Sequence, residues 1–176
     1  MFTNKKILVI SGSTREKSMN ANLIHWIINK YQQFEFSIYK ELAVLPHFNV
    51  DLDTAEPPLS VIKLRQALKN ADGVLICTPE YAMGVPGSLK NLLDWTVSSS
   101  DFSKKPVAVI TASTSGEKAQ ESLLGTLKVI EAHIDPAATL VISHIKSKVN
   151  DKPEVTDVRT IQEIEKLMQA FFKMIN

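Results

Sequence analysis

The stretch Ile7-Leu8-Val9-Ile10-Ser11-Gly12-Ser13-Thr14-Arg15-Glu16-Lys17-Ser18-Met19-Asn20 decides the fold. It joins four consecutive apolar residues to a polar loop, and apolar residues at helical spacing follow from Asn22 to Tyr31. A short continuous apolar run is typical of a strand that is buried on both faces, as in a parallel sheet covered by helices. The stretch therefore predicts a strand, a polar turn and a helix in succession.

The same alternation continues along the rest of the chain. Short β-branched apolar runs predict strands at Ile7–Ile10, Phe36–Tyr39, Val74–Cys77, Val107–Thr111 and Thr139–Ile142. Apolar residues three and four apart predict helices over about Asn22–Tyr31, Ser60–Leu68, Leu89–Val97, Ala119–Ala132 and Thr156–Ile175, the last capped by Thr156 or Asp157. Strands that alternate with helices predict an α/β fold, a doubly wound five-stranded parallel sheet with helices on both faces. We expect residues 1–176 to form one such domain.

Composition excludes several classes of protein. The chain has 176 residues, of which 44% are hydrophobic and 22% charged, and its net charge is +1. This balance is ordinary for a globular domain and gives no basic footprint for nucleic acid. No apolar run approaches the roughly 18 residues needed to cross a bilayer, so neither nucleic acid nor membrane is expected as a partner. The lone Cys77 cannot form an internal disulfide, which favours a cytoplasmic location. No metal-ligand spacing occurs around the histidines, so no metal site is expected: His25, His47, His133, His144.

Three loops are candidates for a binding site. In an open parallel α/β sheet, ligands bind beyond the carboxyl ends of the strands, where the strand order reverses. The loops after the first, third and fourth predicted strands should lie there. The first, Ser11–Asn20, offers several hydroxyls, an amide and Arg15 before a helix, a combination that can hold a phosphate. A polar turn with Ser18 or Asn20 as an ordinary helix cap explains the same residues about equally well.

The other two loops are also open to two interpretations. The second, Thr78–Gly87, contains two prolines, two glycines and Tyr81, against which a flat ring could lie. A rigid structural turn with Tyr81 on the surface is the alternative. The third, Ala112–Lys118, is small and polar, so it can approach the edge of a ligand closely. Taken alone, its pattern favours a helix cap.

Together, the three loops resemble the NADPH-dependent FMN reductase family of flavodoxin-like proteins, which includes quinone, azo-dye and chromate reductases. The resemblance covers about the first two thirds of the chain. It rests on Ile10-Ser11-Gly12-Ser13-Thr14-Arg15-x-x-Ser18-x-Asn20, Leu45-Pro46-His47-Phe48-Asn49-x-Asp51-Leu52, Thr78-Pro79-Glu80-Tyr81 and Val85-Pro86-Gly87-x-Leu89-Lys90-Asn91-x-x-Asp94-Trp95.

The resemblance implies FMN as cofactor and a set of residues that hold it. It assigns the FMN phosphate to Ser13, Arg15, Ser18 and Asn20. It assigns the isoalloxazine ring to Pro79, Glu80 and Tyr81 on one side and to Ser113, Ser115 and Gly116 on the other. The expected cofactor-binding set also includes Ser11, Met19 and Ala82. Family members often have Asn where this chain has Ala82, and many have Gly-Gly where it has Glu117-Lys118-Ala119, so the ring contacts differ there.

The implied activity is that of an oxidoreductase. NADPH or NADH reduces bound FMN, and a small acceptor then takes the electrons, for example a quinone, an azo compound, a metal oxyanion or free flavin. No residue is assigned as an obligatory catalytic acid, because Glu80 is better interpreted as support for the backbone. Such proteins are commonly homodimers or homotetramers, which we expect here.

Two other functions stay open at this point. One is a non-enzymatic FMN electron carrier, although such carriers are usually strongly acidic and this chain has a net charge of +1. The other is a flavin-dependent regulatory protein. Direct oxidation of NAD(P)H distinguishes the enzyme from both.

Overall fold

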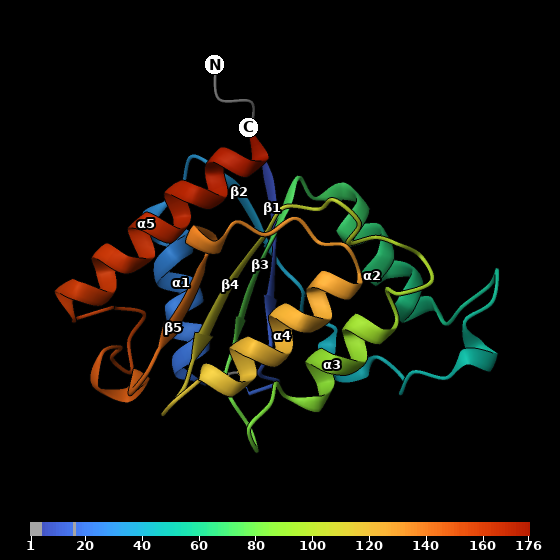
Figure 1. The fold of residues 1–176 in the computed structure, drawn as a ribbon, viewed down its shortest axis with the longest axis horizontal. Helices are drawn as coiled ribbons and strands as arrows, with labels where there is room; N and C mark the ends of the chain where they lie inside the picture. The colour runs from blue at the N-terminus through green and yellow to red at the C-terminus, as the bar shows by residue number, and fades with distance from the viewer. Residues whose placement is uncertain (1–4, 16) are drawn as a thin grey trace.

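The computed structural model describes residues 5–15 and 17–176 and shows a central sheet flanked by helices (Figure 1). All strands are parallel, in the order β2-β1-β3-β4-β5. The strands are β1 (Lys6–Ser11), β2 (Glu35–Ile38), β3 (Gly73–Thr78), β4 (Val107–Ala112) and β5 (Thr139–Ile142). The α-helices are α1 (Met19–Lys30), α2 (Leu59–Asn70), α3 (Gly87–Asp94), α4 (Glu117–Val129) and α5 (Val158–Ile175). The predicted fold class is confirmed, and each predicted strand and helix is present.

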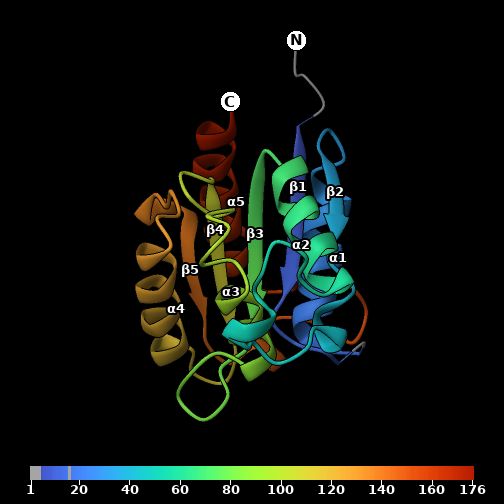
Figure 2. The ribbon, with the colours of Figure 1, turned by 90° about the vertical axis from the view of Figure 1, so that its right-hand side faces the viewer.

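Alternation along the strands divides the core into two layers. In β1, Ile7 and Val9 pack on one face with residues of α1 and α5, whereas Leu8 and Ile10 pack on the other with residues of α2, α3 and α4. Successive side chains of a strand point to opposite faces, so a run without polar residues must be covered on both. Figures 1 and 2 show the strands between these two groups of helices. The apolar runs of β1, β3 and β4 are continuous because helices cover both faces of these strands.

The strand order reverses between β1 and β3, and the chain passes closely over this point. The Gly12 N–H donates to the Cys77 carbonyl at 2.8 Å, so the loop after β1 lies directly on the end of β3. A side chain at position 12 would collide with Thr78, which explains the glycine. The loops after β1, β3 and β4 therefore meet at one edge of the sheet, as predicted.

The predicted end of the third helix was wrong. The third helix was expected to reach Val97, but α3 ends at Asp94 and Val97 is 56% exposed. The Trp95 carbonyl instead accepts a hydrogen bond from Arg65 Nη2 at 2.8 Å, and the indole Nε1 donates to the Pro46 carbonyl at 2.8 Å. The chain after Asp94 continues in tighter turns, in which the Thr96 N–H donates to the Leu93 carbonyl and the Val97 N–H to the Asp94 carbonyl. The last helix, α5, begins at Val158 after the cap Asp157, which is one of the two caps predicted for it.

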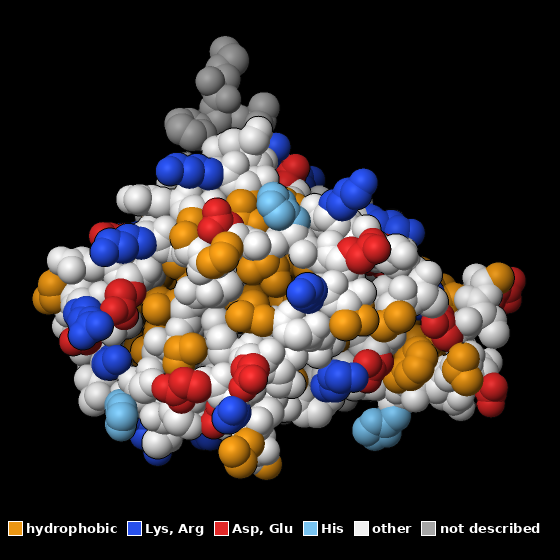
Figure 3. All heavy atoms as spheres, in the orientation of Figure 1, with side chains coloured by type: hydrophobic (Ala, Val, Ile, Leu, Met, Phe, Trp, Pro, Cys, Tyr) orange, Lys and Arg blue, Asp and Glu red, His pale blue; other side chains and the backbone are white. Residues whose placement is uncertain are grey.

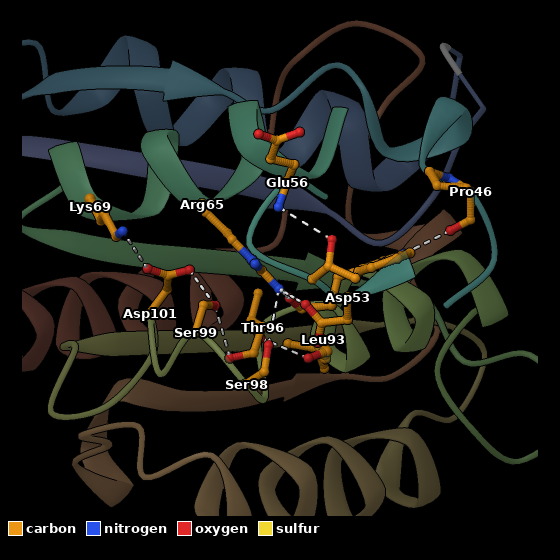
Figure 4. Close-up of polar contacts among 12 residues, drawn as sticks. Pro46, Asp53, Glu56, Arg65, Lys69, Leu93, Thr96, Ser98, Ser99 and Asp101 are labelled. Atoms are coloured by element: carbon orange, nitrogen blue, oxygen red, sulfur yellow. Dashed lines mark hydrogen bonds and ion pairs between the residues drawn. The ribbon is translucent and has the colours of Figure 1, made fainter. Parts of the chain in front are cut away.

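The segment between β2 and α2 is held by a small polar cluster, drawn in Figure 4. Arg65 of α2 bonds Asp53 through Nη2 at 2.7 Å, and the same nitrogen donates to the Trp95 carbonyl and to Ser98. Both side chains of the ion pair are largely buried. The Ser98 hydroxyl and the Arg65 guanidinium together lower the pKa of Asp53, which keeps the pair ionised. This cluster anchors a long connection that contains little regular structure.

Candidate active site

The three predicted loops border an open cavity of about 480 Å³ at the carboxyl edge of the sheet. A cavity of this size is in the range of small-molecule sites, and its place at the strand-order reversal is where α/β sheets bind ligands. Most of its wall comes from predicted site residues, namely Ser13, Arg15, Ser18, Met19, Asn20, Pro79, Tyr81 and Ser113. The remaining wall residues are Lys17, Ala112, Thr114, His144, Ile145, Lys146 and Ser147.

The loop after β1 forms a cationic, hydroxyl-rich wall at the start of α1. Ser18 caps the helix, because its Oγ accepts the Ala21 N–H at 3.1 Å, and Ser13 Oγ accepts the Arg15 N–H at 3.2 Å. Arg15, Lys17 and Lys146 bring positive charge to the cavity, and none of the described residues that line it is acidic. Glu16 lies outside the described residues. A helix N-terminus with hydroxyls and cations suits a phosphate dianion, so these residues fit the phosphate of FMN.

Asn20 lines the same cavity, but its side chain is engaged within the protein. Its Nδ2 donates to the Ala112 carbonyl at 3.0 Å, and its Oδ1 accepts from Cys77 Sγ at 3.2 Å. Burial raises the pKa of Cys77 to about 12, so this thiol is a neutral donor. Cys77 is fully buried. Asn20 thus fixes the first turn of α1 against the ends of β3 and β4.

The loop after β3 forms a tight hairpin that exposes Tyr81. The N–H of Tyr81 donates to the Gly84 carbonyl at 2.8 Å, and the Gly84 N–H donates back at 3.0 Å. The two central residues, Ala82 and Met83, have φ of 48° and 63°, as a type I′ turn requires. Tyr81 is half exposed and lines the cavity, so its ring is available to a planar ligand.

Glu80 does not line the cavity. Its carboxylate accepts hydrogen bonds from Ser115 Oγ at 2.8 Å and from the Ala119 N–H at 2.9 Å, both across the next loop. The Ala119 N–H and then the Ser115 hydroxyl lower the pKa of Glu80, so the group is held ionised. An ionised carboxylate with these partners is a poor proton donor, which agrees with the interpretation that Glu80 supports the backbone.

The structure thus places part of the predicted set outside the lining of the cavity. Ser11 faces a neighbouring pocket on the other side of the loop after β1. Gly116 is buried with φ of 124°, a conformation that glycine adopts without strain. Five predicted residues lie outside the lining: Ser11, Glu80, Ala82, Ser115 and Gly116.

Sequence reasoning missed the wall that follows β5. His144 and Ile145 donate their N–H groups to the carbonyls of Thr114 and Ser113, at 3.1 and 3.0 Å, which draws residues 144–147 over the loop after β4. This segment shows no motif, and its place depends on the pairing of β5 with β4. In contrast, Lys17, Ala112 and Thr114 lie inside the loops already singled out.

Comparison with known proteins identifies the family. The family model described as NADPH-dependent FMN reductase matches residues 5–147. The chain belongs to this family. It is 31% identical to an NADPH azoreductase from Bacillus sp. strain OY1-2 over 94% of both chains. It is 29% identical to a quinone reductase from Escherichia coli K12, over 99% of this chain and 97% of that one.

A solved structure agrees with this membership. FerB, a flavoenzyme NAD(P)H:(acceptor) oxidoreductase from Paracoccus denitrificans, matches with a TM-score of 0.84 and 30% identity over 97% of both chains. The predicted class, an FMN-dependent NAD(P)H oxidoreductase of flavodoxin-like fold, is therefore confirmed at the level of the family. Within the described residues, no helix is long and apolar enough to span a bilayer.

Proposed function

We propose that this FMN reductase family member binds FMN in the 480 Å³ cavity, takes a hydride from NADPH or NADH, and reduces a small acceptor. The proposal depends on one observation. The same cavity is lined by the start of α1, which suits a phosphate, and by the exposed ring of Tyr81. Quinones, azo compounds, metal oxyanions and free flavin are the acceptors we propose. The names of the quinone and azo reductase relatives support the first two.

The residues divide into two working groups. Ser13, Arg15 and Ser18, with the first turn of α1 that Asn20 orients, would hold the phosphate. Pro79, Tyr81 and Ser113 would line the ring. Bound flavin supplies the hydride chemistry, and the protein binds and orients it and shields it from water. Met19 adds apolar contact to this wall, and direct flavin contacts of Ser11, Glu80, Ala82, Ser115 and Gly116 stay predictions.

The first test is the visible spectrum of the protein after reconstitution with FMN and desalting, recorded without oxygen. We expect a bound flavin spectrum that bleaches within seconds of adding NADPH or NADH. Bound flavin that stays oxidised with both donors, and is reduced quickly only by a separate reductase, would indicate an electron carrier. Loss of all flavin on desalting would contradict the proposed site.

Arg15→Ala tests the phosphate wall directly. Removal of a charge-assisted partner should weaken FMN binding by about 10- to 100-fold, since such bonds contribute about 1.5–3 kcal/mol. Arg159→Ala is the matched control, because Arg159 is an exposed arginine on α5 paired with Glu163. Fluorescence titration of FMN measures both. Equal affinities of the two variants would exclude Arg15 from the phosphate site.

We also infer a homo-oligomer and a cytoplasmic location. Several large apolar side chains are exposed in the segment before α2 and in the first turn of α2, namely Val44, Phe48, Val50, Leu52, Leu59 and Ile62. Figure 3 shows apolar side chains at the edge of the molecule where this segment projects. Exposed apolar side chains that are concentrated in one segment are typical of protein interfaces, which supports a homodimer or homotetramer. The unpaired Cys77 supports the cytoplasm, and cell fractionation would test it.

A further inference from the structure

Helix α4 begins without a side-chain cap of its own. Its cap residue, Gly116, has no side chain, and the first backbone N–H groups of an α-helix have no partner within the helix. The Ala119 N–H donates instead to Glu80 Oε2 at 2.9 Å, and the Lys118 and Gly116 N–H groups contribute further to lowering the pKa of this carboxylate. Glu80 thus caps a helix that starts 37 residues further along the chain (117 − 80).

This cap connects two walls of the cavity. The neighbours of Glu80, Pro79 and Tyr81, line one side, and Ser113 and Thr114 line the other. Besides the helix cap, the Glu80 carboxylate accepts from Ser115 Oγ at 2.8 Å. The Glu80 carbonyl lies 3.4 Å from Ser113 Oγ. Both the side chain and the backbone of Glu80 therefore hold the loop after β3 against the loop after β4.

The same contact controls charge beside the cavity. The free N–H groups at a helix start carry a positive partial charge of roughly half an elementary charge. The Glu80 carboxylate offsets this charge at α4, so the helix start does not present a net positive field to the adjacent ring site. Reduction adds electrons to a flavin, and nearby positive charge favours the reduced form.

We propose that Glu80 is a positioning residue of the flavin site, which sets the spacing of the ring walls and lowers the reduction potential of bound FMN by capping α4. The inference rests on the proposed function. It assigns Glu80 no contact with the reacting atoms. The carboxylate acts through the two loops and through the charge at the helix start.

Two substitutions separate the bonds from the charge. Glu80→Gln can keep both contacts, since its amide oxygen can accept the Ala119 N–H and its NH₂ can donate to Ser115 Oγ, but it removes the charge. We expect oxidised FMN to bind within about twofold of the wild-type affinity. We expect reduced FMN to bind about fivefold more tightly relative to oxidised FMN, equal to about 20 mV for a two-electron couple. Glu80→Ala removes the bonds as well, and should weaken oxidised FMN by about tenfold because the walls lose their fixed spacing.

Glu117→Gln is the control variant. It removes a charge from the first turn of the same helix, but Glu117 is exposed and makes no capping bond in α4. Solvent and salt screen such a charge, so we expect affinity and potential within about twofold and a few millivolts of wild type. Thermal unfolding of each variant without flavin reports folding separately from the flavin measurements.

The outcomes are distinct. Wild-type affinity for FMN in Glu80→Ala would overturn the positioning role, and an unchanged potential in Glu80→Gln would overturn the effect of the charge. An equal shift of the reduction potential in Glu117→Gln would also overturn the proposed effect of the Glu80 charge. Any carboxylate near the start of α4 would then lower the potential equally. If Glu80→Ala does not fold, Ser115→Ala is the alternative, because it removes only the hydrogen bond from Ser115 Oγ to the Glu80 carboxylate. It should still weaken FMN binding by several-fold. Failure of the wild-type protein to bind FMN would instead contradict the proposed function.

Discussion

Ala82 and Met83 hold a left-handed backbone at the tip of the loop after β3. Residues other than glycine, asparagine and aspartate adopt this conformation at a cost of roughly 1–2 kcal/mol each. A type I′ turn strongly favours Asn-Gly at its two central positions, which are occupied here by Ala82 and Met83. The strain lies next to Tyr81, in a wall of the cavity, which is where proteins tolerate strained backbone for function.

Met83→Gly should therefore stabilise the protein. We expect the free energy of unfolding to rise by about 0.5–1 kcal/mol, because the relief of strain exceeds the entropy lost by glycine on folding. Urea denaturation measures the change. The control is Ala137→Gly, at an exposed position without positive φ, which should destabilise the protein instead. A loss of stability in Met83→Gly would show that the turn carries no strain.

At the scale of elements, Arg65 of α2 contacts the chain just after α3 and holds the segment before α2. One guanidinium reaches the Asp53 carboxylate and Ser98 (Figure 4), and it also donates to the Trp95 carbonyl. The planar fork of arginine serves several acceptors at once, and the ammonium of lysine cannot reproduce this arrangement. The contact joins three parts of the chain on one side of the sheet.

Arg65→Lys should destabilise the protein by about 2 kcal/mol, because it leaves the Trp95 carbonyl and the partly buried Asp53 incompletely paired. Lys63→Gln on the same helix is the control. Lys63 is paired with Glu41 at an exposed site, so its loss should cost under about 1 kcal/mol. Urea denaturation of both variants provides the comparison. Equal losses would mean that the Arg65 cluster acts as an ordinary surface ion pair.

At the scale of the whole molecule, the exposed apolar surface before α2 predicts self-association. Val50 and Leu52 are 71% and 44% exposed in the isolated chain. A carboxylate placed in an apolar interface must lose its hydration without a partner, which is costly. Leu52→Asp should therefore shift the protein from a dimer or tetramer to a monomer.

Light scattering after gel filtration measures the mass of each species. The control is Val129→Asp, at the exposed end of α4 and outside this apolar set, which should keep the wild-type mass. A wild-type protein that is monomeric at micromolar concentration would contradict the proposed oligomer. Unchanged mass in Leu52→Asp would place the interface elsewhere.

The order of strands and helices and the phosphate-type loop could be predicted from local sequence. Apolar periodicity is local, so the alternation of strands and helices could be predicted from neighbouring residues. Ser13, Arg15 and Ser18 are also near one another in sequence, and the turn into α1 brings them to one wall of the cavity. The family resemblance added the ring loops, and Pro79, Tyr81 and Ser113 do line that cavity.

Tertiary structure decided the contacts between segments far apart in sequence. Glu80 caps the helix that follows the next loop, Arg65 binds the Trp95 carbonyl just after α3, and residues 144–147 complete the cavity wall beside the paired strands β4 and β5. Each depends on which strands are neighbours and on where a long side chain finds an unpaired backbone group. Such partners cannot be predicted from local sequence. Buried polar groups need hydrogen-bond partners, but the folded structure determines which distant residues come close enough to provide them.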